Sequence, residues 1–290
     1  MAINKEIDAV TGVETTGHVW DGDLKELNKP LPKWWLYVLY ASIVWSIGYW
    51  VLYPAWPGIS GYTRGTLGYS QRVEVAKDLA LAKESQAKFI EAIGAKPIEE
   101  IEKNPDLMEF VLRGGATQFG NNCAPCHGKG AQGFKGYPNL NDDDWLWGGG
   151  NEAIQNTIRY GIRSGHEKAH EGAMPRFGID QILTNAQISD TADYVLSLSG
   201  VKGDTAAVER GKTVFGEQCA ACHGAEAKGT LEMGAPNLTD GIWLFGGRKV
   251  DVEETIRNGR SGVMPAWEGK LDPVTIKMLA IYVHSLGGGK

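Results

Sequence analysis

All four cysteines of the chain fall in two copies of the pattern Cys-x-x-Cys-His. The copies are Cys123-Ala124-Pro125-Cys126-His127 and Cys219-Ala220-Ala221-Cys222-His223. This pattern is the attachment signature of a c-type haem, in which two thiols bond to the vinyl groups and the following imidazole binds the iron. The two intervening residues make one tight turn, so both sulfurs face one porphyrin edge. We therefore expect two covalently bound haems c, with His127 and His223 as the proximal ligands.

Other uses of a Cys-x-x-Cys pair are a structural disulfide, a thioredoxin-like dithiol and half of a zinc site. The two motifs leave no further cysteine pair to complete a zinc ribbon, and each motif already carries its own histidine. Because the motif occurs twice, with matching residues around it, haem attachment is favoured over these alternatives.

Met174 and Met264 are the candidates for the sixth iron ligand. Each precedes a proline, and each follows a tryptophan-containing loop at a matching place in its copy. Ligation within each copy is the simplest arrangement, although the spacing also permits each methionine to cross to the other iron. A thioether ligand raises the reduction potential and closes the iron to oxygen or peroxide, so the expected work is electron transfer.

The first copy has a longer interval between its histidine and its methionine, 47 residues against 41. The extra residues include His166 and His170, and replacement of Met174 by one of them is an open alternative. We expect this interval to be a solvated surface loop.

The two motifs belong to an internal duplication. Its matching pairs are Gly115 and Gly211, Phe119 and Phe215, Pro138-Asn139-Leu140 and Pro236-Asn237-Leu238, Trp145 and Trp243, Arg159 and Arg257, and Tyr194 and Tyr282. The repeat resembles the class I cytochrome c fold, a small helical bundle in which an N-terminal helix crosses a C-terminal helix. The fold class implied is mainly α, with two tandem haem domains.

That resemblance assigns roles to the matching residues. It implies that Gly115 and Phe119 face Tyr194 across one helix crossing, and that Gly211 and Phe215 face Tyr282 across the other. The carbonyls of Pro138 and Pro236 are expected to accept the second ring proton of the proximal histidines. The two arginines, Arg159 and Arg257, are expected beside the haem propionates, with Trp145 and Trp243 shielding them.

A stretch without any charged residue runs from Trp34 to Tyr53 and is flanked by tryptophans and tyrosines. Twenty helical residues at about 1.5 Å each span a hydrocarbon core of roughly 30 Å. The stretch begins too late and is too long for a cleaved signal peptide, so we expect it to remain as an anchor. Because haem c is attached outside the cytoplasmic membrane, the residues that follow the anchor should lie in a periplasm.

The expected organisation follows from these features. It comprises a mostly unpacked cytoplasmic arm (1–33), a transmembrane anchor (34–56), a periplasmic linker with a helix over 73–94 (57–106), and two cytochrome c domains (107–200 and 201–290). A net charge of −6 over 290 residues disfavours a nucleic-acid partner.

Taken together, the stretch NKPLPKWWLYVLY, the anchor and the two haem domains resemble the CcoP/FixP family, the dihaem subunit of cbb3-type cytochrome c oxidases. The resemblance implies a non-catalytic subunit of the inner membrane. It would take electrons from a donor cytochrome c or a quinol-oxidising complex. It would pass them through a monohaem c subunit to the haem–copper subunit that reduces oxygen. A dihaem peroxidase, and a membrane-tethered dihaem shuttle for another reductase, are the alternatives.

Overall fold

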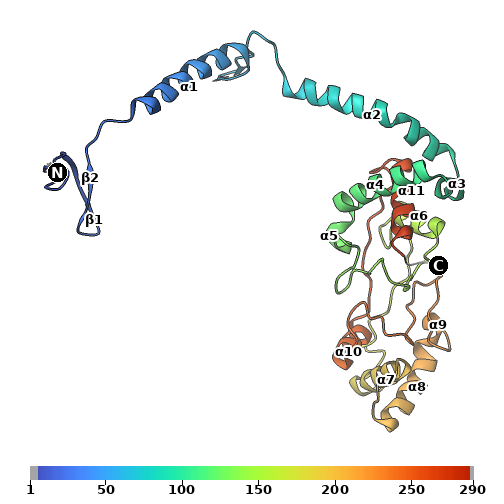
Figure 1. The fold of residues 1–290 in the computed structure, drawn as a ribbon. Coiled ribbons are helices and arrows are strands. Elements are labelled where there is room, and N and C mark those ends of the chain that lie inside the picture. The colour runs from blue at the N-terminus through green and yellow to red at the C-terminus, as the bar shows by residue number, and fades with distance from the viewer. Residues whose placement is uncertain (1–5, 288–290) are drawn as a thin grey trace. The chain divides into compact units, whose positions relative to one another are not determined.

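The structure is a computed structural model that describes residues 6–287 (Figure 1). Residues 1–5 of the expected arm and 288–290 of the expected second haem domain lie outside the described residues. The chain divides between Ser85 and Gln86 into two units. Helices are the main regular structure of the described chain, as the sequence predicts, and the strands are short.

The first unit contains β1 (Thr15–Trp20), β2 (Leu24–Leu27), α1 (Lys33–Leu52), β3 (Pro57–Gly58) and β4 (Gly61–Tyr62). The helix α2 (Gln71–Ala95) crosses the division. The second unit contains α3 (Ile98–Glu102), α4 (Pro105–Asn122), α5 (Ala124–His127), α6 (Asn151–Tyr160), α7 (Asn185–Leu198), α8 (Thr205–Gln218), α9 (Ala220–His223), α10 (Lys249–Asn258) and α11 (Pro273–Ser285).

The described part of the expected arm has few buried side chains, as an unpacked arm would, but it contains regular structure that was not expected. β1 and β2 form an antiparallel hairpin in which Trp20 pairs with Leu24. The turn between them contains Asp21 and Gly22 at φ 49° and 90°, the left-handed backbone that an Asp-Gly pair adopts readily. Upstream, Ile7 forms a bridge with Glu14 and adds a third short segment. The Asp-Gly signal at the turn could have revealed this hairpin.

Helix α1 confirms the predicted membrane helix. It covers 20 residues, is apolar enough to cross a membrane, and has none of its side chains buried inside the protein. The helix ends at Leu52 with Tyr53 as its C-cap, and the next residue, Pro54, has no backbone N–H to continue it. The apolar side chains of α1 are therefore available to lipid or to other membrane helices.

The predicted helix over 73–94 is also confirmed, as α2. Its C-terminal end is packed through Ile93, which is fully buried with Ile101, Val111 and Met278. The Lys277 ammonium on α11 donates to the carbonyls of Ile93 and Lys96, both at 2.9 Å. A cation at these carbonyls stabilises a helix end whose own acceptors lack partners.

The helix crossings of the haem region are exchanged relative to expectation. A Cβ on Gly115 would lie 2.6 Å from the Tyr282 Cβ, and Phe119 packs on Tyr282 with ring centroids 5.6 Å apart. Thus α4 crosses α11, and by the same contacts α8 crosses α7, where Tyr194 packs on Phe215 at 5.3 Å. The expected pairing of Gly115 and Phe119 with Tyr194 is therefore wrong.

The short connection between α7 and α8 explains the exchange. Only six residues separate these two helices, and so short a connection makes consecutive helices antiparallel neighbours. Because α7 is thereby held on α8, the crossing position on α4 is filled by the last helix, α11. Each of two buried cores consequently combines residues from both sequence copies.

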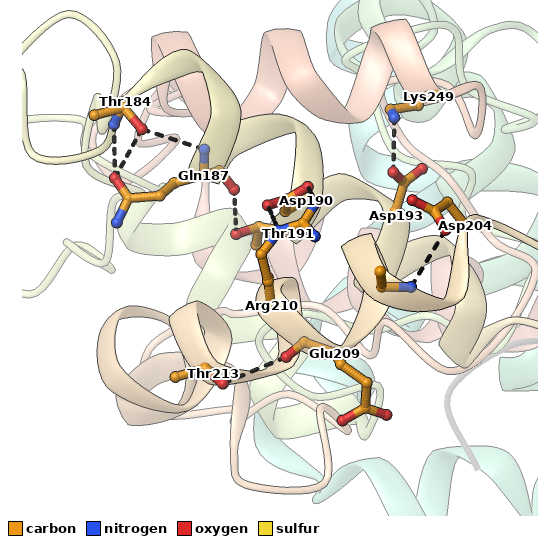
Figure 2. Close-up of polar contacts among 11 residues, drawn as sticks. Thr184, Gln187, Asp190, Thr191, Asp193, Asp204, Glu209, Arg210, Thr213 and Lys249 are labelled. Carbon is orange, nitrogen blue, oxygen red and sulfur yellow. Dashed lines mark hydrogen bonds and ion pairs between the residues drawn. The ribbon is translucent and has the colours of Figure 1, made fainter.

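Figure 2 shows the polar contacts that hold α7 in this place. Asp190 on α7 forms an ion pair with Arg210 on α8, with a shortest distance of 2.7 Å. Asp193 accepts from Lys249 at the start of α10, also at 2.7 Å. Thr184 and Gln187 form a capping box that begins α7.

Candidate haem-binding sites

The first Cys-x-x-Cys-His motif forms one helical turn directly after α4. Cys123 ends α4 and begins α5, and the His127 amide donates to the Cys123 carbonyl at 2.9 Å. Gly128 follows at φ 80°, a backbone conformation that favours glycine and turns the chain away. The His127 Nδ1–H donates to the Pro138 carbonyl at 3.1 Å, as predicted, so the Nε2 atom is the one available to an iron.

The second motif repeats this geometry. The His223 amide donates to the Cys219 carbonyl at 3.0 Å, and the ring Nδ1–H donates to the Pro236 carbonyl at 3.1 Å. Gly224 adopts φ 79° after the motif. Equal geometry in the two copies indicates that both motifs serve the same purpose.

The protonation states suit haem attachment better than the alternative chemistries. Burial lowers the pKa of His127, an effect that the Pro138 hydrogen bond opposes, and the same holds for His223 with Pro236. The rings are therefore neutral at pH 7, which is the state that binds a metal. Burial raises the pKa of the Cys123 thiol to about 11, with a further contribution from Cys126, so this sulfur is a thiol and not the thiolate of a dithiol redox site.

The disulfide and zinc interpretations gain no support. All four cysteines are free thiols. Within residues 6–287, no three His, Cys, Asp or Glu side chains gather as they would around a metal ion.

Each methionine packs against the buried cluster that the first cysteine of the other copy's motif also joins or contacts. Met264 lies in the cluster of partly buried side chains that includes Cys123, Leu140 and Trp145. Its backbone forms a reciprocal pair of hydrogen bonds with Ile162, both 3.0 Å, just beyond α6. The loop that carries Met264 is therefore attached to the first motif's surroundings.

The second core has the mirror arrangement. Met174 packs in the cluster that includes Cys219, Leu238 and Trp243. Its amide donates to the Arg260 carbonyl at 2.9 Å, and the Arg260 amide donates back at 3.2 Å. Of the two arrangements that the sequence left open, the packing favours crossed ligands.

The alternative histidine ligands are engaged elsewhere. His166 Nδ1 accepts from the Lys168 amide at 3.0 Å, and its Nε2 lies 3.2 Å from Glu268. His170 stacks on Trp147 with centroids 4.3 Å apart and contacts Thr157 through Nε2.

The two repeat arginines have protein partners in this structure. Arg159 lies 3.5 Å from Glu268, while Arg257 donates to Asn185 at 2.5 Å. Their expected position beside the propionates stays a prediction. The Arg159 Nε atom is the one that lies 3.5 Å from Glu268, and it is buried without making a hydrogen bond.

A reciprocal aromatic contact between the two haem-binding halves was missed from the sequence. Trp147 lies against Gly234, where an added Cβ would come within 2.6 Å of the ring. Phe245, its counterpart in the repeat, lies in the same way against Gly136, and the Gly136 amide donates to the Leu244 carbonyl at 2.9 Å. Trp147 and Phe245 are 98 residues apart in the sequence, and so are Gly136 and Gly234, a regularity that could have revealed the contact.

These residues fit a covalently attached haem. In each half, two free thiols and one neutral imidazole with a committed Nδ1 stand among apolar side chains that are only partly buried. A flat apolar group with two thioether links requires such surroundings. The fold and the two motifs thus define a c-type cytochrome with two tandem haem domains and one N-terminal membrane helix.

Comparisons with known proteins give the same class and a particular family. Residues 12–60 match the N-terminal domain of cytochrome oxidase-cbb3, FixP, residues 112–199 match cytochrome c, and residues 206–283 match cytochrome c oxidase, cbb3-type, subunit III. A FixP subunit of a cbb3-type cytochrome c oxidase from Bradyrhizobium sp. (strain ORS 278) is 55% identical, with complete coverage of both chains. A CcoP subunit from Azospirillum brasilense is 55% identical over 99% of each chain, and a FixP subunit from Rhizobium meliloti is 50% identical over 99% of each.

The chain belongs to the FixP/CcoP family of cbb3-type cytochrome c oxidase subunits. The expected family is therefore confirmed, and with it a cytochrome c subunit concerned with electron transport.

Proposed function

We propose that the chain is a dihaem electron relay and performs no substrate chemistry of its own. When bound, each haem c accepts and releases one electron at its iron. The protein's part is to hold each iron between a histidine and a methionine, so that no position is open to a small molecule. The observation that carries this proposal is the placement of one methionine in the core cluster of each motif.

The proposed ligand sets are crossed. The first haem is attached through Cys123 and Cys126 and bound by His127, with Met264 as its sixth ligand. The second haem is attached through Cys219 and Cys222 and bound by His223, with Met174 as its sixth ligand. The contacts of Met264 with Ile162 and of Met174 with Arg260 support this assignment.

The proposed location and partners follow from the anchor and the family. Helix α1 would hold the chain in the cell inner membrane, with the residues before it in the cytoplasm and both haem domains in the periplasm. Electrons would arrive from a donor cytochrome c or a quinol-oxidising complex. They would leave through a monohaem c subunit for the haem–copper subunit that reduces oxygen. A helix whose side chains all face outward supports the anchoring step.

The ligand assignment can be tested in a chain that carries only the first haem. Cys219→Ala together with Cys222→Ala removes the second attachment site. In that background, Met264→Leu should abolish the absorption band of methionine-ligated ferric haem, and Met174→Leu should leave it in place. The reverse result would show ligation within each copy and would overturn the crossed assignment.

Two-haem chains provide the matching measurement if the one-haem background folds poorly. Redox titration of the full chain with Met264→Leu should lower one of two potentials, because loss of the thioether destabilises Fe(II). Carbon monoxide should then bind at one haem only. Rapid carbon monoxide binding by both haems of the unaltered reduced chain would contradict the relay and favour a peroxidase.

A further inference from the structure

The arm before the membrane helix is a folded element with apolar side chains on its surface. We use the name arm module for residues 6–29, which contain the Ile7–Glu14 bridge and the β1–β2 hairpin. At the tip of the hairpin, Trp20 is 56% exposed and Leu24 is 60% exposed. These two residues form a cross-strand pair, so they stand on the same face.

Such a small sheet gains little from its own core. Thr15 is the one residue of the described arm module that is fully buried. A sheet of this size is marginally stable in water unless its apolar face packs against something else. The exposed pair at the tip therefore gains stability if it packs against a partner surface.

The connection to α1 restricts where that surface can be. Five residues, 28–32, separate the end of β2 from the start of α1, and two of them are prolines. Fully extended, they reach no more than about 18 Å. The arm module must therefore remain close to the membrane surface at which α1 begins.

The charge of the arm module distinguishes the two kinds of surface found there. It has a net charge of −4 with His18 neutral, from six carboxylates against Lys25 and Lys29. Two of the carboxylates, Asp21 and Asp23, are exposed beside Trp20 and Leu24. Anionic lipid headgroups on the cytoplasmic leaflet repel such a tip. The cytoplasmic loops of multi-span membrane proteins, in contrast, are enriched in Lys and Arg.

We infer that the hairpin tip of the arm module docks on the Lys- and Arg-rich cytoplasmic loops of a membrane-embedded partner subunit of the oxidase. Trp20 and Leu24 provide the apolar contact, and Asp21 and Asp23 pair with basic side chains of the partner. The inference rests on the proposed function, because it requires the arm to be cytoplasmic and the chain to be assembled with other oxidase subunits. It adds a second attachment beyond the membrane helix.

Photocrosslinking in the intact complex tests the contact directly. Trp20 is replaced by benzoylphenylalanine in the full chain, and the adduct is identified by mass spectrometry. We expect a crosslink to a basic cytoplasmic loop of a membrane-embedded subunit. The control carries the same group at Ile59, which is fully exposed beyond the other end of α1 and should not label those loops. Labelling of lipid alone, of a second copy of this chain, or of nothing would overturn the inference.

A charge variant tests the ionic part. Asp21→Asn with Asp23→Asn keeps side chains that tolerate the left-handed backbone at position 21 while removing both charges. The loss of two surface ion pairs should weaken association of the chain with the oxidase core roughly two- to thirtyfold, and the loss should shrink at high salt. The matched control is Glu209→Gln with Glu217→Gln, two exposed positions of α8. If both double variants associated equally well with the oxidase core, the ionic contact would be contradicted.

The failure of this inference can be separated from failure of the proposed function. The haem spectra and potentials of each sample report the relay, and they should be unchanged in both double variants. If the oxidase core still co-purifies and the haems are intact while the tip labels no subunit, only the docking of the arm module is wrong. If no oxidase core is recovered with the unaltered chain, the proposed function itself fails.

Discussion

Gly211 lies where α8 crosses α7, at a distance that leaves no room for a side chain. A Cβ built on Gly211 would lie 2.5 Å from the Asp190 carbonyl carbon and 2.9 Å from the Tyr194 Cβ. Backbone atoms cannot rotate away as a long side chain can, so Gly211→Ala must push the two helices apart. Gly216, in the same helix, has no atom within 4 Å of an added Cβ and is the matched control.

The size of the effect follows from two opposing contributions. Alanine in a helix interior is favoured over glycine by about 1 kcal/mol, and Gly216→Ala should show that gain alone. Overpacking against a rigid neighbour costs about 1–3 kcal/mol, and contact with backbone places Gly211→Ala at the upper end. The expected net loss is therefore about 2 kcal/mol. For a unit of 150–250 residues this corresponds to a decrease of roughly 4–8 °C in Tm, against an increase of about 2–4 °C for Gly216→Ala.

Thermal unfolding of the full chain with both haems attached measures these shifts. Far-UV circular dichroism follows the helices, and the haem absorption follows their surroundings. The pair Gly115→Ala and Gly120→Ala repeats the comparison at the crossing of α4 and α11, because a Cβ on Gly120 meets nothing within 4 Å. If Gly211→Ala raised the midpoint as much as Gly216→Ala, the close crossing of α7 and α8 would be refuted.

Two further predictions concern pH and charge. Burial, with smaller contributions from Asp240 and Asp142, raises the pKa of Asp144 to about 6, so its charged form destabilises the fold above that pH. Asp144→Asn should therefore raise the free energy of unfolding at pH 7–8. The gain should be only roughly 1 kcal/mol, because solvent screens a half-buried carboxylate. In thermal unfolding the gain should vanish near pH 4, where the carboxyl group is protonated. Hydrogen bonds from Arg248 and Lys135 hold the pKa of Asp251 well below its usual 3.8. Asp251→Asn should lower the midpoint of thermal unfolding at pH 7. The difference in midpoint between the variant and the unaltered chain should shrink as the pH falls below 3.8. A constant difference down to pH 2 would show that the ion pairs are not its cause.

Three features could be predicted from the sequence because each depends on residues close together in the chain. They are the haem motifs, the hydrogen bonds of the histidine ligands, and the membrane helix. Cys123, Cys126 and His127 fit within one helical turn, and the carbonyl that accepts from His127 is 11 residues away. The absence of charge over 20 residues likewise determines a spanning helix without reference to the rest of the fold. The hairpin of the arm also has a local signal, the Asp-Gly turn.

Only the tertiary structure decided which of the helices α7 and α11 crosses the helix before each motif, and which methionine packs in the core beside that motif. Tyr194 and Tyr282 have equivalent local sequences, as do Met174 and Met264, so no local preference distinguishes the two partners of α4. The choice depends on the six-residue connection that makes α7 and α8 neighbours, and on the fit of Gly211 to Tyr194 and of Gly115 to Tyr282. Packing between segments more than 150 residues apart, such as α4 and α11, is a property of the assembled core, and a repeated sequence pattern is compatible with either pairing.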